Sequence, residues 1–259
     1  MKKSKIAVLV AMVVVLAFSL AACGGSDKSS SDKTVYKVGT EPTFPPFDTT
    51  DEDQNIVGLD MDLIKAIGED QGFDVEFENL SFDGLIPALK AGNIDIVAAG
   101  MNKDDEDRQK EVDFSDSYYE SKLFVAVTED NTTIKSVEDL TPDMKVVAQT
   151  GTTGASKVQE LKDAGKIKEA VILDGLDTCM MKLINGDVSA VINDKPVTEA
   201  YMKKQPDKIK MVGEALNAEN YGFAVQKGNA ELVEKINNGL KNIKENGTYD
   251  KLVDEWFNK

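Results

Sequence analysis

The sequence predicts an α/β protein with two lobes. Segments in which apolar and polar residues alternate, or apolar residues run together, take turns with segments that place apolar residues at helical spacing. This alternation begins near Val35 and begins again near Lys145, which gives two series of about ninety residues each. Because open α/β sheets bind ligands at the carboxyl ends of their strands, we expect a binding cleft between the two lobes.

The first series starts with a strand at Val35–Thr40, where apolar and polar residues alternate. A helix is predicted at Asp60–Gln71, because its apolar residues share one face and Gly72 provides a stop signal. The other predicted elements of this series are strands at 74–78, 94–98 and 123–127 and a helix at 81–91 with Ser81 as N-cap and Gly92 at its end.

The second series continues with strands at 145–148, 171–173 and 190–192, helices at 153–164, 176–185 and 197–203, strands near 211 and at 223–225, and closing helices at 230–245 and 249–257. Cys179 lies in an apolar helical pattern, which predicts a buried structural thiol. Trp256, the only tryptophan, is expected to anchor the last helix in the core.

The N-terminal segment has the features of a lipoprotein export signal. Residues 1–22 combine a lysine-rich start with an apolar stretch too short for an ordinary membrane span. The end of this segment, with Cys23, resembles a bacterial lipobox, which predicts lipidation of Cys23 (palmitate); a plain signal peptide with a chance cysteine is the alternative. Residues 23–33 form a predicted flexible tether, and the folded part is long enough for two lobes.

Composition excludes several classes of function. The net charge is −16, which argues against nucleic acid and against electrostatic docking on anionic lipid. The chain has no histidine, so it lacks the usual base of nucleophilic catalysis and the commonest ligand of catalytic metals. It has no Walker A or dinucleotide fingerprint. We therefore expect no catalytic residue, no cofactor and no metal site.

Two acidic stretches are predicted to be surface loops. Asp51, Asp53 and Asn55 resemble a calcium loop, but Ile56 stands where that loop requires glycine, so a polar turn is the interpretation. The acidic run at 104–107 is predicted to be a solvated loop.

One arginine stands out in this chain. Arg108 is its only arginine, and every other basic residue is lysine. Lysine suffices as a solvated surface charge, whereas the planar guanidinium holds a carboxylate through two parallel hydrogen bonds. Composition alone leaves open whether Arg108 grips a carboxylate or is an ordinary surface residue.

Six ordered segments resemble motifs of one known family, the solute-binding proteins for polar amino acids of bacterial ABC importers (extracellular solute-binding proteins, family 3). The segments are Thr40–Phe47, Gly58–Leu63 with Ala66 and Ile67, Gly84–Leu89, Val112–Tyr119, Gln149–Thr153 and Ile192–Asp194. The resemblance implies a type II periplasmic-binding-protein clamshell with a two-strand hinge. The hinge crossings would lie near Tyr118–Lys122 and Ala218–Tyr221, with lobe 1 at 34–119 and 221–259 and lobe 2 at 122–218.

The same resemblance implies a ligand site. Arg108 matches the arginine that grips the ligand α-carboxylate, and Asp194 matches the aspartate that meets the α-ammonium. The other implied contacts are Ala99, Gly100 and Asn102 around the carboxylate, Gln149 and Thr153 from the second lobe, Phe44 and Phe82 around the side chain, and Glu41 at its end. The spacing between Gly100 and Arg108 is one residue longer than usual for the family.

Glu41 bears on the choice of ligand. With Arg108 and Asp194 neutralising the zwitterion, Glu41 leaves a spare negative charge, which is costly to bury unless it is paired. Arginine or lysine would pair it and glutamine could donate to it, whereas glutamate and aspartate are disfavoured. Histidine and cystine remain possible ligands.

The resemblance implies binding, not catalysis. The expected function is extracytoplasmic capture of an L-amino acid by a lipid-anchored monomer and its delivery to the permease of an ABC importer. Two alternatives remain open. One is a sensor domain that acts with a separate membrane partner, and the other is an enzyme on the same fold that resembles cyclohexadienyl or arogenate dehydratases.

Overall fold

The computed structural model describes residues 33–258. The predicted signal peptide, the lipidation site Cys23 and the predicted tether up to residue 32 lie outside the described residues. Residues from Thr34 onward form one compact unit, which contains two separate five-stranded sheets.

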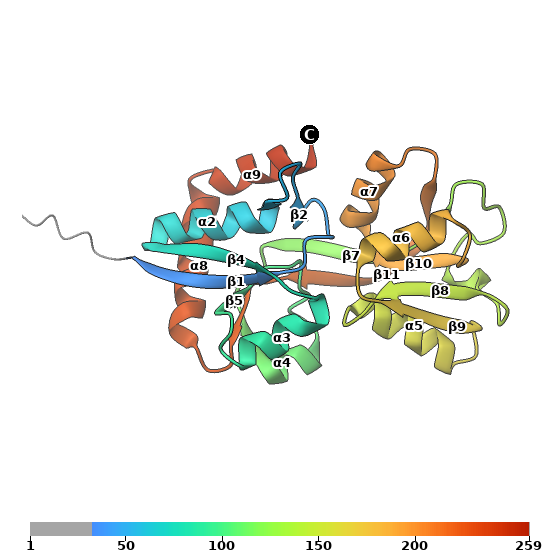
Figure 1. The fold of residues 1–259 in the computed structure, drawn as a ribbon, viewed down its shortest axis with the longest axis horizontal. Coiled ribbons are helices and arrows are strands. Elements are labelled where there is room, and N and C mark those ends of the chain that lie inside the picture. Colours follow the sequence, from blue (N-terminus) through green and yellow to red (C-terminus); the bar gives the residue numbers. More distant parts are fainter. Residues whose placement is uncertain (1–32, 259) are drawn as a thin grey trace, which may run out of the picture. The chain divides into compact units, whose positions relative to one another are not determined.

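The first sheet has the strand order β4-β1-β5-β12-β6, of which β4, β1 and β5 are labelled in Figure 1. Its strands are β1 (Thr34–Thr40), β4 (Phe73–Asn79), β5 (Ile96–Val97), β6 (Val112–Phe114) and β12 (Ala224–Gln226). Strand β1 pairs in parallel with β4 and β5, whereas β12 runs antiparallel to β5 and β6. A strand from near the C-terminus therefore completes a sheet that the N-terminal segment begins.

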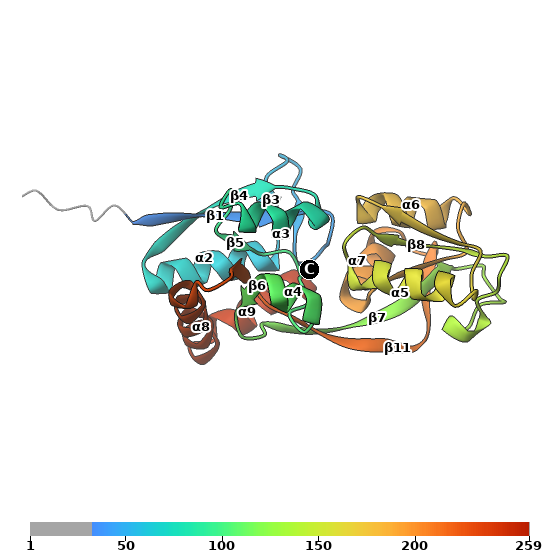
Figure 2. The ribbon, with the colours of Figure 1, turned by 90° about the horizontal axis from the view of Figure 1, so that it is seen from below.

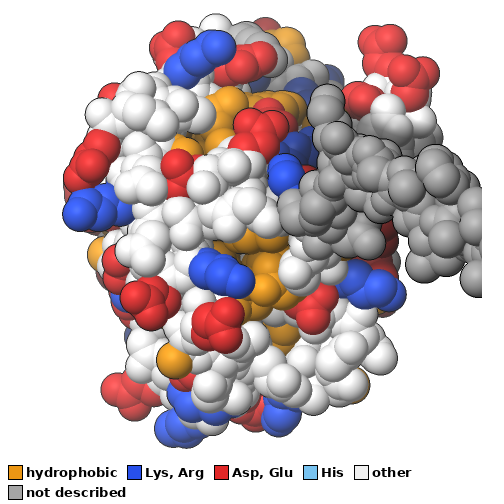
Figure 3. All heavy atoms as spheres, turned by 90° about the vertical axis from the view of Figure 1, so that its left-hand side faces the viewer, with side chains coloured by type: hydrophobic (Ala, Val, Ile, Leu, Met, Phe, Trp, Pro, Cys, Tyr) orange, Lys and Arg blue, Asp and Glu red, His pale blue; other side chains and the backbone are white. Residues whose placement is uncertain are grey.

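We call this sheet and the elements around it lobe 1. The other elements of lobe 1 are the hairpin strands β2 (Thr49–Thr50) and β3 (Ile56–Val57) and the helices α2 (Leu59–Gln71), α3 (Phe82–Lys90), α4 (Glu106–Glu111), α8 (Ala230–Glu245) and α9 (Thr248–Phe257). At the outer end of lobe 1, the surface mixes acidic, basic and apolar side chains (Figure 3).

Helix α2 shows how the apolar pattern becomes packing. Met61, Ile64 and Ile67 are fully buried, and Gly72 ends the helix in the left-handed conformation that glycine adopts without strain. The helix packs closely on α8, where a Cβ at Gly239 would lie 2.8 Å from a methyl group of Ile67. The predicted helix and its stop signal are confirmed here.

The second sheet has the order β11-β7-β10-β8-β9. We call this sheet and its helices lobe 2. Its elements are β7 (Tyr119–Thr128), β8 (Lys145–Gln149), β9 (Glu169–Leu173), β10 (Ala190–Asp194) and β11 (Ile209–Tyr221), the helices α5 (Thr153–Asp163), α6 (Leu176–Ile184) and α7 (Lys195–Lys204), and the short 3₁₀ helix η1 (Val137–Asp139). Cys179 is fully buried on α6, and burial raises the pKa of its thiol to about 12, as expected of a structural cysteine.

Two long strands connect the lobes. Figure 2 shows β7 and β11 running side by side from lobe 1 into lobe 2. They pair antiparallel from Tyr119 opposite Tyr221 to Thr128 opposite Ile209, with an irregularity between Val212 and Asn217. The predicted hinge segments lie at one end of this pair. The lobe boundaries within the two strands remain a proposal.

One predicted loop is wrong. Glu106 and Asp107 open helix α4, because the carboxylate of Asp105 accepts hydrogen bonds from the backbone N–H groups of Asp107 and Arg108. The helix has only six residues, too few to show a helical period in sequence. A smaller difference concerns Ser81, which occupies the N-cap position of α3 without making a side-chain capping bond.

Two buried carboxyl groups lie beneath the loops of lobe 1. Asp60 and Asp48 are both 0 % exposed. Asp60 accepts hydrogen bonds from the backbone N–H of Gly100 (2.8 Å) and the hydroxyl of Tyr118 (2.7 Å), while Asp48 accepts one from the hydroxyl of Thr40 (2.9 Å). Burial raises the pKa of Asp60 to about 7 and that of Asp48 well above its usual range.

These carboxyl groups predict that the domain loses stability as pH rises from about 4 to about 7. An unfolded aspartate titrates at about 3.9, whereas folded Asp60 titrates at about 7. Between these values the folded state binds more protons than the unfolded state, so the unfolding free energy falls as pH rises. Thermal unfolding of the domain followed by circular dichroism from pH 5 to 7.5 measures this slope.

Asp60→Asn should reduce the slope, because its amide oxygen still accepts both hydrogen bonds but does not titrate. Asp53→Asn, at an exposed position in the 51–55 turn, is the matched control and should leave the slope unchanged. Equal slopes for Asp60→Asn and the unmodified domain would show that burial of Asp60 does not cause the effect.

Candidate functional site

All ten residues that the sequence predicts for the ligand site line one cavity between the lobes. They are Glu41, Phe44, Phe82, Ala99, Gly100, Asn102, Arg108, Gln149, Thr153 and Asp194. Two further residues line the same cavity and are missing from the predicted set: Thr152 and Glu219.

The strand ends place these side chains. In lobe 2, Gln149 and Asp194 are the last residues of the parallel neighbours β8 and β10, and Thr153 is the first residue of α5. Thr152 is the N-cap of α5, and its hydroxyl accepts a hydrogen bond from the N–H of Ala155 (3.0 Å). The cavity thus lies at the carboxyl ends of the strands, where open α/β sheets bind their ligands.

Arg108 is buried on α4 and reaches across to lobe 2. Its Nη1 donates to the backbone oxygen of Asn102 (3.2 Å), and its Nη2 donates to that of Gly151 (2.9 Å). The guanidinium also lies over the ring of Phe82, 5.4 Å from its centroid. Burial lowers the pKa of Arg108, against the opposing effect of nearby Asp105 and Glu219. These bonds engage two of the five N–H groups of the guanidinium.

The loop after β5 forms the wall next to Arg108. Gly100 has φ +53, and a Cβ there would lie 2.6 Å from the ring of Phe44, so this position requires glycine. Its N–H donates to Asp60, so this N–H is already engaged within the protein. The side-chain oxygen of Asn102 accepts hydrogen bonds from the N–H groups of Asp104 and Asn220, which ties the loop to the hinge strand β11.

Asp194 lines the same cavity as Arg108. Its Oδ1 accepts hydrogen bonds from Ser121 (3.0 Å) and from the hydroxyl of Tyr221. Burial raises the pKa of Asp194 well above its usual range, and the neighbouring carboxylate of Glu219 adds to this rise. Glu219 is only 2 % exposed.

Glu41 lies in a different part of the wall. The hydroxyl of Thr43 donates to both of its carboxylate oxygens, at 3.0 and 2.7 Å. The amide of Gln149 donates to the same carboxylate from lobe 2 (2.9 Å) and also to the backbone oxygen of Asp174 (2.9 Å). Burial raises the pKa of Glu41 despite these bonds. Gln149 therefore links the two lobes through Glu41.

The space among these side chains is small. Its volume is about 10 Å³, close to the minimum for one water molecule. The lobes contact each other around it through Arg108 and Gly151 and through Glu41 and Gln149. A ligand of several heavy atoms can enter only if the lobes separate, and bending of the hinge strands is the motion that this fold provides.

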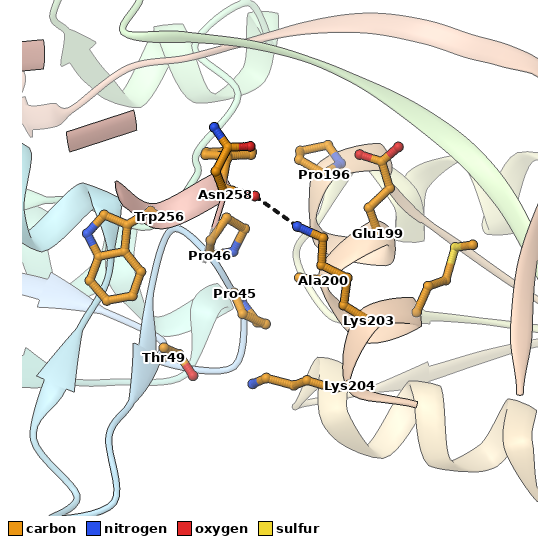
Figure 4. Close-up of a pocket in the computed structure, with 12 residues that line it drawn as sticks. Pro45, Pro46, Thr49, Pro196, Glu199, Ala200, Lys203, Lys204, Trp256 and Asn258 are labelled. Atoms are coloured by element: carbon orange, nitrogen blue, oxygen red, sulfur yellow. Dashed lines mark hydrogen bonds between the residues drawn. The ribbon is translucent and has the colours of Figure 1, made fainter. Parts of the chain in front are cut away.

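A larger groove of about 760 Å³ lies beside the hinge and contains none of the predicted residues (Figure 4). The loop with Pro45 and Pro46 and the end of α9 form one wall, and α7 forms the other. Across it, Lys203 donates a hydrogen bond to the backbone oxygen of Phe257 (2.8 Å). The small cavity is the stronger candidate, because it holds buried charges of both signs.

Trp256 lines the groove and also packs against the hydrophobic core, as predicted. Its ring lies on the lobe 1 side, only partly buried, and its indole N–H donates to Asp62 on α2 (2.8 Å). The last helix is thus anchored by a hydrogen bond as well as by apolar packing.

Comparisons with known proteins agree with the geometry. The family described as "Bacterial extracellular solute-binding proteins, family 3" matches residues 36–259. A probable histidine-binding protein of Neisseria gonorrhoeae is 34 % identical over 94 % of this chain and 92 % of its own. A putative ABC transporter arginine-binding protein 2 of Escherichia coli (strain K12) is 34 % identical over 100 % of both chains.

Solved structures show the same likeness. An ancestral arginine-binding protein bound to arginine has a TM-score of 0.82 and 44 % identity, covering 87 % of this chain and 99 % of its own. The ancestral arginine-binding protein bound to glutamine has a TM-score of 0.80 and 45 % identity, covering 88 % and 99 %. Within residues 33–258, none of the helices combines the length and the apolar character that a membrane span needs. The chain therefore belongs to the bacterial extracellular solute-binding proteins of family 3 and has their two-lobed type II periplasmic-binding-protein fold, as the sequence predicted.

Proposed function

We propose that this protein binds a cationic or polar L-amino acid outside the membrane and delivers it to an ABC importer. Arginine and lysine are the first candidates, and glutamine follows. The observation that carries this proposal is the placement of Arg108, Asp194 and Glu41, one buried base and two buried acids, around a single cavity.

Arg108 and Asp194 suit the two charges that every amino acid shares. The guanidinium offers a planar pair of N–H donors to the α-carboxylate, which makes a short and strong bidentate contact. The carboxylate of Asp194, already oriented by Ser121 and Tyr221, accepts from the α-ammonium. Both groups are buried, so a ligand that lacked either charge would leave one of them unpaired at a high cost.

Glu41 then selects the side chain. A guanidinium or ammonium group there would replace the amide of Gln149 as the partner of this buried carboxylate. The amide of glutamine would donate a weaker, neutral hydrogen bond, and an acidic side chain would place two like charges together. The names of the relatives, which include arginine and histidine as ligands, support a nitrogen-rich side chain.

The cellular setting is proposed from sequence and family. Lipidation at Cys23, after removal of residues 1–22, would hold a monomeric receptor at the outer surface of the cell membrane through the tether at 23–33. The exposed faces of both lobes would present the closed form to the permease. The lobe limits at 34–119 with 221–259 and at 122–218 belong to the same proposal.

We propose binding without catalysis. A dehydratase on this fold would need a general acid beside the leaving hydroxyl group. Glu41 and Asp194 are the acids in the cavity that the sequence singles out, and binding uses both for the ligand's cationic groups. Turnover of prephenate or arogenate by the purified protein would support the enzymatic alternative.

Thermal stability reports which ligand the site prefers. Saturating arginine or lysine, at about a hundred times the dissociation constant, should add about 2.7 kcal/mol of stability and raise the melting temperature by several degrees. A thermal-shift panel of the twenty L-amino acids, with refolded protein free of carried-over ligand, measures this. Arg108→Lys should abolish the shift, because lysine cannot make the bidentate contact.

Glu41→Gln separates the proposed choice of ligand from the proposed binding of amino acids. It should weaken arginine binding about 10- to 100-fold, by removing one charge-assisted contact, while weakening glutamine binding much less. Titration calorimetry with both ligands gives the ratio. Equal losses for both would refute the role of Glu41, and no shift with any amino acid would refute the binding function itself.

Gly151 lies where the two lobes touch. This residue has φ +75, and a Cβ there would lie 3.0 Å from the Cβ and 3.1 Å from the Cα of Asp83 in lobe 1. Gly151→Ala should therefore hold the lobes apart and weaken ligand binding about tenfold or more, at the scale of a small overpacking strain. Titration calorimetry measures the affinity.

Gly186→Ala is the matched control. Gly186 also lies in lobe 2, with φ +76, but a Cβ there would meet nothing within 4 Å. Both variants should lose a similar stability of about 1 kcal/mol from the left-handed backbone. If both bind with unchanged affinity, contact at Gly151 does not matter for closure.

A further inference from the structure

Glu219 is a buried acid in the cavity that the predicted site does not include. It lies on β11, two residues before Tyr221, and its side chain lines the cavity together with Asp194 and Arg108. It is 2 % exposed. A carboxyl group buried this deeply beside another acid needs either a proton or a cation nearby.

The two acids are buried neighbours that line the same small cavity. Burial raises the pKa of Asp194, and the nearby carboxylate of Glu219 raises it further, which favours a proton on this pair. The remaining donors are few: Ser121 and Tyr221 donate to Oδ1 of Asp194, and Asn217 donates to Oε1 of Glu219 (3.1 Å). Oδ2 and Oε2 receive none of these bonds.

Other charged groups surround the pair. From α4, the guanidinium of Arg108 is close enough for Glu219 and Asp194 to affect its pKa, and Asp105 at the N-cap of α4 acts on the same guanidinium. From β11, Tyr221 contacts Asp194 directly. Glu41 lines the same cavity but is partnered by Thr43 and Gln149. Among the residues that line this cavity, Arg108 is therefore the cation that accompanies the two acids.

We propose that Glu219 is a second ammonium-binding residue, and that the α-ammonium of the ligand takes the place of the proton that Asp194 and Glu219 share. The inference rests on the proposed function and refines its account of the ammonium site. An ammonium group has three N–H donors, so it can donate to both carboxylates at once. A single acid, as the sequence implies, would use fewer of these donors.

The proton balance follows from this exchange. Before binding, the pair consists of one carboxylic acid and one carboxylate. After binding, two carboxylates accept N–H donors from the ligand, and the displaced proton passes to the solvent. Each ligand bound should therefore release up to one proton. Affinity should fall as pH is lowered, because protons then compete with the ammonium for the same pair.

The pair also bears on selectivity. An α-hydroxy or α-keto analogue of the amino acid has no ammonium group and cannot displace the proton. Two acids therefore lower the affinity for an analogue without the amine more than a single acid would. Secondary or fully substituted amines, with fewer N–H donors, should be rejected for the same reason.

The test is calorimetric titration of the full folded domain with L-arginine at several pH values between 6 and 8. Each titration is repeated in two buffers that differ in ionisation enthalpy, which gives the number of protons released. The unmodified domain should release close to one proton. Glu219→Gln should release fewer protons, bind arginine about 10- to 100-fold more weakly at pH 8, and show a weaker dependence of affinity on pH.

The controls separate the possible outcomes. Glu214→Gln changes an exposed acid on the same strand and should behave like the unmodified domain. Glu219→Asp keeps a carboxylate and should restore part of the proton release, and it serves as the test variant if Glu219→Gln does not fold. Proton release that persists in Glu219→Gln but disappears in Glu41→Gln would overturn the inference.

The two proposals fail in different ways. If no amino acid binds the unmodified domain, the proposed function is wrong. If arginine binds the unmodified domain and Glu219→Gln with the same affinity and the same proton count, the function stands and only the role of Glu219 is wrong.

Discussion

The burial of charge between the lobes is the constraint on which the rest of this structure depends. One guanidinium and three carboxyl groups, those of Arg108, Asp194, Glu219 and Glu41, line a cavity that has room for about one water molecule. Charged groups tolerate such burial only when hydrogen bonds or opposite charges compensate for lost hydration. Here part of the compensation comes from the opposite lobe. The stability of these buried charges therefore depends on the relative position of the two lobes.

The fold places the three carboxyl groups at or near the ends of strands. Strand ends in both sheets lead into short loops at the cavity, and the paired strands β7 and β11 connect the two lobes. The loop after β5 is fixed from behind: Asp60 accepts from the N–H of Gly100, and the N–H of Asn220 on β11 donates to Asn102. This loop is therefore positioned by groups outside the cavity, whereas Arg108 and Glu41 also bond to the opposite lobe.

Much of this could be predicted from sequence, for identifiable reasons. Long helices such as α2 and α8 show a clear apolar period, and the ordered motifs brought together ten residues that do line one cavity. Helix α4 was beyond reach because its six residues carry no period and its start depends on the cap at Asp105. Glu219 belongs to no motif, and its inward direction depends on the irregular pairing of β11 after Val212.

The groove between α7 and α9 has a practical consequence. Its two walls belong to different lobes, and the only tryptophan of the chain, Trp256, lies on the lobe 1 wall (Figure 4), where its indole N–H donates to Asp62 of α2. Separation of the lobes would widen this groove, which the indole ring helps to line. The protein therefore carries an intrinsic fluorophore at the place where its halves meet, and we expect its emission to respond when an unlabelled molecule opens or closes.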